Sequence, residues 1–280
     1  MKMKQKRSII IERRHKILSL FSEHEDLHVS DLSKLLGVSE LTIRRDLDAL
    51  AGEGLIQRIH GGGRIMTDSY PEPPVFSDKH LIGQQQKHDI AVYISSLVND
   101  GDTVFLNAGT TTMQVINQIK DKHIVIVTNN ALACTVMDHC AASLISTGGE
   151  YNQHNQSYTG LMAASILQKM NASICILGVN GISADNGITT SNYMETMINE
   201  EMLKRCRGKR IAAADSSKIG KVFNFSTSHI SNIDILVTDS GADSRELQKI
   251  RDAGVKVILA DVLGLESPQS GILSLYRDLR

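Results

Sequence analysis

The chain has few aromatic residues and few of the cysteines that cross-link small proteins or bind metal ions in them. It has no tryptophan, 4% aromatic residues and four cysteines among 280 residues. The cysteines lack the close, paired spacing of a disulfide framework or a zinc site, and cytosolic conditions favour reduced thiols. We therefore predict free thiols that act as small core residues: Cys134, Cys140, Cys175 and Cys206.

Long hydrophobic runs are also absent. Hydrophobic residues make up 41% of the chain, but no stretch approaches the roughly 20 apolar residues that a membrane-spanning helix needs. Near the N-terminus, the apolar run at residues 8–11 is interrupted by Glu12 and does not fit a signal peptide. These features predict a cytoplasmic protein without membrane association.

Proline is scarce and concentrated in one place. Three of the four prolines, Pro71, Pro73 and Pro74, stand in a segment that cannot continue a helix or a central strand. A chain of 280 residues is long enough for a small module and a larger domain. We predict an N-terminal domain over residues 1–65, a linker over 66–79 and a larger domain over 80–280.

Neither sign of charge dominates the whole chain, whose formal net charge is −1. The distribution is uneven, because residues 1–64 hold 12 Lys and Arg against 9 Asp and Glu, whereas the remainder holds 18 against 22. Only the N-terminal part therefore has an electrostatic reason to approach a polyanion.

Residues 38–50 combine a helix start, an apolar stripe and a polar face. Ser39 is a good N-cap, with Thr42 three residues later. The apolar side chains recur near a period of 3.6 and predict a face toward a small core; they are Leu41, Ile43, Leu47 and Leu50. The side chains left outward are Glu40, Thr42, Arg44 and Arg45.

A second short helix is expected to precede this one, with Ser30 as its cap and Gly37 in a tight left-handed turn between the two. Two amphipathic helices joined by glycine also occur in bundles that never meet nucleic acid. The continuation at residues 52–64 favours a winged helix-turn-helix, because a short alternating segment runs into a glycine-rich tip. Arg58, His60 and Arg64 stand where such a wing touches phosphates, and the glycines would let backbone amides approach closely.

The segment His24–His28 reads H-E-x-x-H, a pattern that on a helix places two imidazoles around zinc. Here it falls where the first helix must end before Ser30, and no third ligand follows at suitable spacing. We interpret it as a polar turn and predict no metal site.

The larger domain alternates helical and strand-like segments. A helix is predicted over residues 84–98, and seven short apolar runs follow. This alternation predicts an α/β fold with a mainly parallel sheet covered on both faces. The expected strands are 104–106, 124–127, 144–146, 174–177, 211–214, 235–237 and 255–259.

Ligands of such sheets bind beyond the carboxyl ends of the strands, so the residues just after each run carry the most information. Asn107–Thr112 places glycine and hydroxyls at the start of a helix, where free amides favour an anion. The same residues also serve simply as caps, and by themselves they leave the two interpretations level. Polar residues after the other strands favour a ligand site: Asn129, Gly148, Gly149, Gly178–Gly181, Asp215 and Lys218.

The motifs Thr-Ile-Arg-Arg-Asp-Leu at 42–47 and Arg-Ile-His-Gly-Gly at 58–62 resemble those of the DeoR family of bacterial transcription regulators. The resemblance extends over nearly the whole chain. It implies a winged helix-turn-helix joined to a sugar-phosphate-sensing domain whose fold is similar to that of ribose-5-phosphate isomerase. The further motifs in the family's order are Gly109–Thr111, Val127–Asn129, Gly148–Gly149 and Ala214–Lys218.

The expected site residues follow. For double-stranded DNA, the predicted contacts are Thr42, Arg44 and Arg45, flanked by Ser39 and Glu40, with Arg58 and His60 on backbone phosphates. The resemblance implies that Gly109, Thr110 and Thr111 hold the phosphate of an effector, while Asn129 and Gly149 line its pocket. Asn107 and Gly148 are further candidates for effector binding. It also implies that Asp215 and Lys218 meet polar groups of the ligand, the alternative for Lys218 being an ion pair with Asp215.

Three positions depart from the family. Asn107 stands where members often have aspartate, Asn199 about where many have lysine, and Gly63 where many have alanine. We expect the first two to affect which effector is favoured, and the third to affect only the wing tip.

Two classes of function fit these observations. One is a regulator, most simply a homo-oligomeric repressor of a carbohydrate-utilisation operon, whose DNA binding responds to a phosphorylated sugar or related metabolite. The other is a sugar-phosphate isomerase with an accessory domain, which needs a positioned base. Residues 178–183 offer only Asn180 where the isomerases place acids, and no acid follows until Asp185. We therefore favour the regulator, without catalytic residues or cofactor.

Overall fold

The computed structural model describes residues 26–52, 56–59, 61–65 and 83–262, together with residues 10, 13–14, 16–17 and 20–21. The predicted linker, the basic N-terminal tip, His24, Glu25 and His60 lie outside these residues. The chain divides into two compact units, Met1–Glu72 with Ser191–Met194, and Pro73–Thr190 with Glu195–Arg280.

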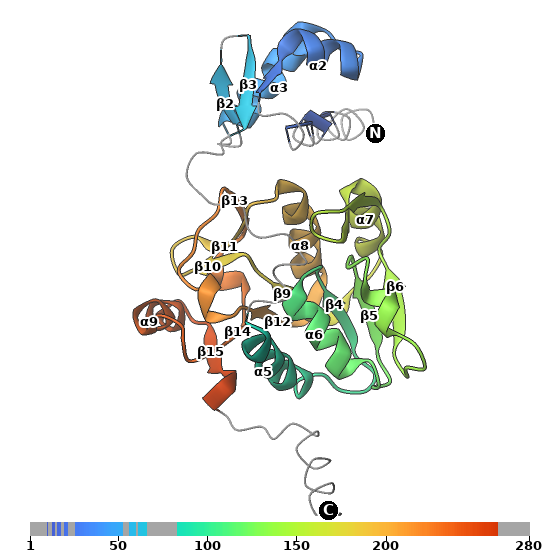
Figure 1. Cartoon of the computed structure of the whole chain (residues 1–280), viewed down its shortest axis with the longest axis vertical. Coiled ribbons are helices and arrows are strands. Elements are labelled where there is room, and N and C mark those ends of the chain that lie inside the picture. The colour runs from blue at the N-terminus through green and yellow to red at the C-terminus, as the bar shows by residue number, and fades with distance from the viewer. Residues whose placement is uncertain are drawn as a thin grey trace, which may run out of the picture. The chain divides into compact units, whose positions relative to one another are not determined.

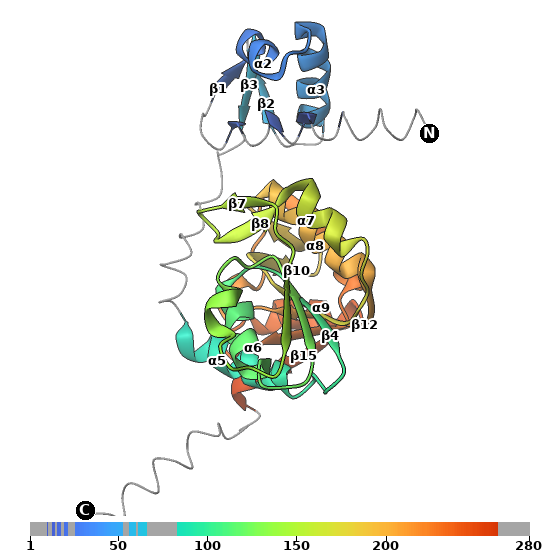
Figure 2. The same ribbon diagram turned by 90° about the vertical axis from the view of Figure 1, so that its right-hand side faces the viewer.

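The N-terminal unit has the element order of a winged helix-turn-helix (Figures 1 and 2). Its three strands form an antiparallel sheet in the order β1-β3-β2. Gly37 joins the two helices with φ 64° and ψ 31°, so the predicted left-handed turn is confirmed. The elements are β1 (Asp26–His28), α2 (Val29–Leu36), α3 (Glu40–Gly52), β2 (Ile56–Ile59) and β3 (Gly62–Ile65).

Two details before α2 differ from the prediction. Residues Asp26–His28 form a strand and not a polar turn, because they pair with Arg64, Gly63 and Gly62 of β3. The helix then begins at Val29 with His28 at the N-cap, so Ser30 lies inside the first turn and does not cap it. Long-range pairing, which a local pattern does not reveal, determines both details.

The core of this unit is small and aliphatic. Ile43, Leu47 and Leu50 of α3 are at most 1% exposed, as predicted. Leu41 was predicted to join them and does not, because its side chain is 59% exposed. The other buried apolar residues are Ile17, Phe21, Leu27, Val29, Leu32 and Ile56.

Asp46 of α3 forms ion pairs with two arginines of the N-terminal segment. Its two carboxylate oxygens accept hydrogen bonds from Nε of Arg13 at 2.5 Å and Nε of Arg14 at 3.2 Å. The aspartate side chain is 3% exposed, and those of the arginines are 15% and 29% exposed. A carboxylate buried to this extent is stable only while it is paired. Asp46 therefore has a structural role within the family motif.

Two of the three wing glycines lie in a strand, whereas Gly61 lies in the turn before it with φ 79°. Gly62 and Gly63 are both buried in β3. A Cβ at Gly62 would collide with the carbonyl of Leu27, and one at Gly63 would lie 2.9 Å from Cδ1 of Ile56. The prediction that Gly63 concerns only the wing tip is therefore wrong, whereas the approach of the wing glycines to phosphates stays a prediction.

The C-terminal unit is built on a seven-stranded sheet in the order β15-β14-β12-β9-β4-β5-β6. Every neighbouring pair in it is parallel, and each of its strands overlaps one of the seven predicted runs. The elements are α5 (Gln84–Ser95), β4 (Thr103–Leu106), α6 (Thr110–Ile119), β5 (Val125–Thr128), η1 (Ala133–Val136), β6 (Ser143–Ser146), β7 (Glu150–Asn152), β8 (Ser157–Thr159), α7 (Gly160–Leu167), β9 (Ala172–Gly178), β10 (Gly181–Ser183), β11 (Gly187–Thr190), α8 (Tyr193–Arg205), β12 (Cys206–Ala213), η2 (Ser216–Lys218), β13 (Phe225–Ser228), η3 (Ile230–Asn232), β14 (Ile235–Thr238), α9 (Ser244–Asp252), β15 (Lys256–Leu259) and η4 (Ala260–Val262).

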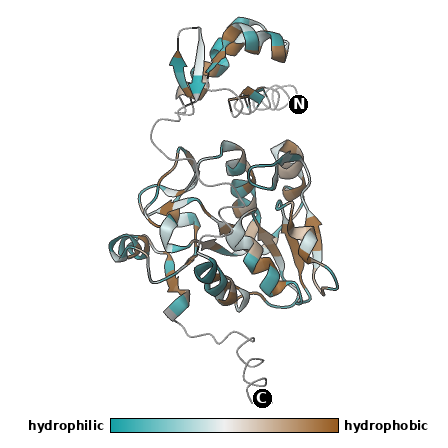
Figure 3. Ribbon diagram, viewed as in Figure 1, coloured by the Kyte–Doolittle hydropathy of each residue, from teal (hydrophilic) through white to brown (hydrophobic). Residues whose placement is uncertain are grey.

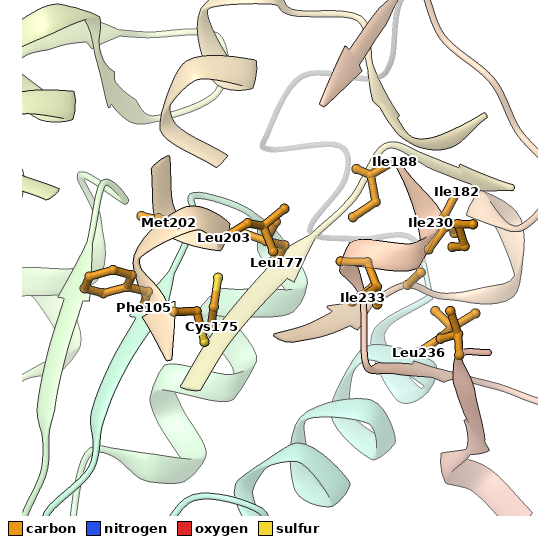
Figure 4. Packing of buried hydrophobic residues seen from close by; sticks show 14 of the residues in the cluster. Phe105, Cys175, Leu177, Ile182, Ile188, Met202, Leu203, Ile230, Ile233 and Leu236 are labelled. Carbon is orange, nitrogen blue, oxygen red and sulfur yellow. The ribbon is translucent and has the colours of Figure 1, made fainter. Parts of the chain in front are cut away.

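Both faces of this sheet are covered, and its strands are mostly hydrophobic (brown in Figure 3). Successive side chains of a strand point to opposite faces. In β9, Ile174 and Ile176 pack with α5 and α6, which lie side by side (Figure 1), whereas Cys175 and Leu177 pack with α7, α8 and α9. Figure 4 shows Phe105, Cys175 and Met202 in this second cluster.

Two smaller antiparallel sheets were not predicted. Strands β7 and β8 form a hairpin beside α7 (Figure 2), and β10, β11 and β13 form a three-stranded sheet. Each of these strands has only three or four residues. Runs this short carry little periodicity.

The cysteines fall into two classes. Cys175 and Cys206 are buried, and burial raises the pKa of both thiols. Cys134 is exposed and Cys140 is partly exposed, so the prediction that all four act as core residues is wrong for these two. Within the described part of the chain, none of the helices has the length and hydrophobicity to cross a membrane.

Replacing Asp46 by alanine is expected to lower the free energy of unfolding of the N-terminal unit by about 2–4 kcal/mol, since two arginines lose a buried partner. Hydrogen exchange at the α3 amides of the full chain measures this change. Asp48→Ala is the control, because Asp48 is 65% exposed and its pair with Arg58 is expected to contribute no more than about 1 kcal/mol. Equal effects of the two substitutions would contradict the role of Asp46.

Candidate functional site

Helix α3 presents a continuous exposed stripe in the N-terminal unit. Leu41, Arg44, Arg45 and Asp48 are all exposed, and each arginine lies three or four residues from Leu41 and from Asp48. Residues at this spacing lie on one side of a helix. Arg44 pairs with Glu40 through Nη2 and Oε2 at 3.2 Å, with both side chains more than half exposed. Arg45 makes no ion pair or hydrogen bond with any residue that the structure describes.

The start of α3 is fixed by Ser39. Its hydroxyl accepts a hydrogen bond from the Thr42 amide at 3.3 Å and lies 2.9 Å from the Thr42 hydroxyl. The predicted N-cap is therefore confirmed. Ser39 and Glu40 are exposed and Thr42 is half-buried, so these three predicted DNA contacts surround the first turn of the helix.

The predicted wing arginines both have partners within the unit. Arg58 pairs with Asp48 at 2.9 Å, and this ion pair holds β2 against α3. Arg58 also donates to the carbonyl of Gly62 in β3. Arg64 donates to both carboxylate oxygens of Asp26 at 2.6 and 2.7 Å, and its hydrogen bond lowers the pKa of that carboxyl group. His60, the third of these residues, lies outside the described residues.

The second candidate site lies at the carboxyl edge of the large sheet. The chain runs from β4 to β5 and β6 on one side, and then returns to β9 on the other side of β4. Ligands of open parallel sheets bind at such a reversal of strand order, where the loops after the two central strands diverge. The loops that follow β4 and β9 therefore stand where a ligand crevice is expected.

Asn107 joins those two loops. Its Nδ2 donates to the carbonyl of Gly178 at 2.9 Å, and its Oδ1 accepts from the Gly178 amide at 2.8 Å. Nδ2 also donates to Oδ1 of Asn199 on α8 at 3.1 Å. Two of the three positions expected to depart from the resembling family are thus in direct contact.

Asn129 joins the loop after β5 to its neighbours. Its Oδ1 accepts from the Ala108 amide at 2.8 Å, and its Nδ2 donates to the carbonyl of Tyr158 at 2.9 Å. Asn107 and Asn129 are 4% and 2% exposed, respectively. Both amide side chains therefore hold backbone segments in place, and only part of their hydrogen-bonding capacity remains for a ligand.

The N-terminus of α6 offers the clearest anion-binding geometry. Gly109 is the N-cap, and the first-turn amides that follow have no partner within the helix. The hydroxyl of Thr112 donates to the carbonyls of Asn107 and Gly109 and thereby shapes this turn. Thr110 and Thr111 are 9% and 8% exposed, and their hydroxyls have no partner among the described residues.

The remaining predicted residues follow other strands at the same edge. Gly148 and Gly149 come after β6, both with positive φ, and a Cβ at Gly149 would lie 2.5 Å from the carbonyl of Thr159. After β12, Asp215 caps η2 by accepting from the Ser217 amide. The alternative ion pair between Asp215 and Lys218 is not among the salt bridges of the described residues.

Two carboxylates at this edge were not predicted from the sequence. Asp239 accepts from the amides of Ser216 and Gly241. Glu195 on α8 accepts from Nδ2 of Asn155 at 2.6 Å and from the hydroxyl of Thr190 at 3.1 Å. Along the sequence no acid follows Asn180 until Asp185, but the fold brings Glu195 close to it. Asn180 donates to the same Thr190 hydroxyl at 3.2 Å, so Glu195 is two hydrogen bonds away.

No group of three or more His, Cys, Asp or Glu residues that could hold a metal ion occurs among the described residues. His28, the described histidine of the H-E-x-x-H pattern, is the N-cap of α2.

In comparisons with known proteins, both units match domains of the same family. Residues 13–69 match the family described as DeoR-like helix-turn-helix domain, and residues 83–240 match the DeoR C terminal sensor domain. A putative aga operon transcriptional repressor from Escherichia coli O157:H7 is 32% identical to this chain, covering 89% of it and 93% of that protein. The lactose phosphotransferase system repressor of Streptococcus mutans is 31% identical, covering 85% of this chain and 95% of that protein.

Among solved structures, ribose 5-phosphate isomerase A from Methanocaldococcus jannaschii aligns with 48% of this chain and 54% of its own length. The TM-score is 0.36 and the sequence identity is 13%. A likeness at this level carries no argument about activity.

The contact between Asn107 and Asn199 predicts coupled substitutions. Asn107→Asp is expected to lower the free energy of unfolding by about 2–4 kcal/mol, because a buried carboxylate would face the Gly178 carbonyl and the Asn199 oxygen. Adding Asn199→Lys supplies a cation, so the double variant is expected to recover at least about 1 kcal/mol beyond additivity. Denaturant unfolding of the full chain measures this cycle, and strict additivity would contradict it. Asn171→Asp, at an exposed residue that accepts from Arg207, is the control and should change stability by less than about 0.5 kcal/mol.

Proposed function

This chain belongs to the DeoR family of DNA-binding transcription regulators, and we propose that it represses a carbohydrate-utilisation operon under the control of a phosphorylated sugar. The observation that carries the proposed binding of α3 to DNA is the exposed stripe of this helix. Acidic partners hold Arg13, Arg14, Arg58 and Arg64 within the unit. Arg44 and Arg45 remain on the outer face of a capped helix, where a helix-turn-helix protein contacts base edges.

We propose that the protein acts as a homo-oligomer. The N-terminal unit alone offers a small interface, and high specificity normally requires two or more such units on repeated half-sites. A repressor named for the lactose phosphotransferase system is among the relatives, which supports a sugar-related operon. A single half-site bound tightly by a monomer at nanomolar concentration would contradict the oligomer.

We propose that the effector binds at the carboxyl edge of the sheet, with its phosphate at the N-terminus of α6. The supporting observation is that Thr110 and Thr111, both largely buried, have hydroxyls without a partner among the described residues beside the first-turn amides. Asn155 and Glu195, which are hydrogen-bonded to each other at 2.6 Å, are a donor and an acceptor of the kind that bind sugar hydroxyls. An effector regulates DNA binding only if it binds the competent and incompetent states unequally, and about 1–3 kcal/mol of coupling is typical.

Isomerase activity is not part of the proposal. Asn180 is an amide and cannot act as a base, and both oxygens of Glu195 accept hydrogen bonds within the protein. The relatives named above are transcription repressors.

Selection of genomic fragments by the purified full-length protein at near-physiological salt is expected to enrich a short repeated site, since non-specific phosphate binding is weakened there. Arg45→Ala is then expected to relax the preference at one base pair and to cost about 1–3 kcal/mol of binding free energy. Arg44→Ala tests the neighbouring arginine in the same way. Arg251→Ala, an exposed charge on α9 of the other unit, controls for net charge and should leave binding unchanged.

A uniform loss of affinity for all sequences would assign the substituted arginine to phosphate contact. If folded protein enriches no sequence, both in the absence and in the presence of sugar phosphates, the proposed function is wrong.

Sugar phosphates are expected to change the affinity for the selected DNA, whereas their unphosphorylated parents are not. Titration with a panel of pentose and hexose phosphates, read by fluorescence anisotropy of labelled DNA, measures this effect. Thr111→Val removes one hydroxyl at the phosphate and should raise the effective concentration of the active compound about tenfold. Thr103→Val, at the amino end of β4 and the opposite edge of the sheet, is the matched control. A panel without effect on DNA binding, or turnover of a pentose phosphate by the protein, would contradict the proposal.

A further inference from the structure

Leu41 is the second residue of α3, and its side chain is 59% exposed. Ile43, Leu47 and Leu50 of the same helix fill the core without it. Leu41 precedes Arg44 by three residues and Arg45 by four, so it lies on the same side of the helix as both arginines. The outer stripe of α3 thus begins with a large aliphatic side chain.

Exposed leucines are common on protein surfaces and have no special meaning by themselves. Leu35 on α2, which is 65% exposed, is an example in the same unit. Leu41 differs from Leu35 in its surroundings. It stands in the first turn of the second helix, where proteins of this architecture contact base edges, and it is flanked by Glu40, Thr42 and the two arginines.

An aliphatic side chain can neither pair with a phosphate nor form a hydrogen bond with a base. In the major groove, the apolar group that it can contact is the 5-methyl group of thymine. From this position and chemistry we infer that Leu41 reads a thymine of the operator by packing against its methyl group. This inference rests on the proposed function, because it requires α3 to enter the major groove.

The helix geometry also fixes where this thymine lies. Three or four residues of α-helix advance by roughly 4.5–6 Å, and one base step of DNA advances by about 3.4 Å. The thymine therefore lies within about two base pairs of the position whose preference depends on Arg44 or Arg45. A thymine far from that position would not satisfy the inference.

The test compares thymine with uracil, which lacks only the methyl group and keeps the same hydrogen-bonding edge. Duplexes carrying the site selected by the full-length protein are prepared with each thymine in turn replaced by uracil. At one position in each half-site, this replacement is expected to weaken binding of the unsubstituted protein about fourfold, which corresponds to one buried methyl group. Leu41→Ala is expected to bind the thymine and uracil duplexes equally.

Leu35→Ala is the matched control, because it removes an equally exposed leucine outside the arginine stripe. It should retain the full fourfold discrimination. Both substitutions are at exposed positions, so thermal unfolding of the variants should match that of the unsubstituted protein.

Three results would overturn the inference while leaving the proposed function intact. The first is a selected site without thymine near the arginine-dependent position. The second is binding that is insensitive to every uracil replacement, and the third is unchanged discrimination by Leu41→Ala. If no sequence is selected at all, the proposed function fails and the inference fails with it.

Discussion

The hydrogen bonds between Asn107 and Gly178 determine the geometry of the carboxyl edge of the sheet. They join the ends of β4 and β9 at the point where the chain reverses its direction across the sheet. Because the Asn107 side chain both donates and accepts, it fixes both loops with one neutral group. The N-terminus of α6 begins three residues later, and the Thr112 hydroxyl holds that turn against the Asn107 carbonyl. The proposed phosphate position thus depends on an uncharged, buried network.

The same network makes two buried positions depend on each other. Asn107 and Asn199 contact each other, so a charge introduced at one of them would face the amide of the other. A single buried charge would lack a partner and would destabilise the unit. The neutral pair preserves the link between β4 and α8.

In the N-terminal unit, some charged side chains form ion pairs within the unit and others remain exposed. Asp46 is buried between two arginines of the N-terminal segment, and Asp48 pairs with Arg58 of the wing. Both aspartates belong to the segment that carries Arg44 and Arg45. Sequence proximity suggests that the aspartates balance or orient these arginines, but the structure directs them to other partners. Arg44 and Arg45 consequently remain exposed on the outer face of the helix.

The sequence by itself determined the seven parallel strands, the helix cap at Ser39 and the glycine turn at Gly37, because each of these depends on local periodicity or on one backbone conformation. Only the tertiary structure decided three other features: strand β1, the exposure of Leu41, and the position of Glu195 near Asn180. These depend on which distant segments pack together, since β1 needs its partner β3 and Glu195 arrives on a helix 15 residues further along. Local sequence patterns specify elements, whereas contacts between distant elements specify which faces are buried and which polar groups meet.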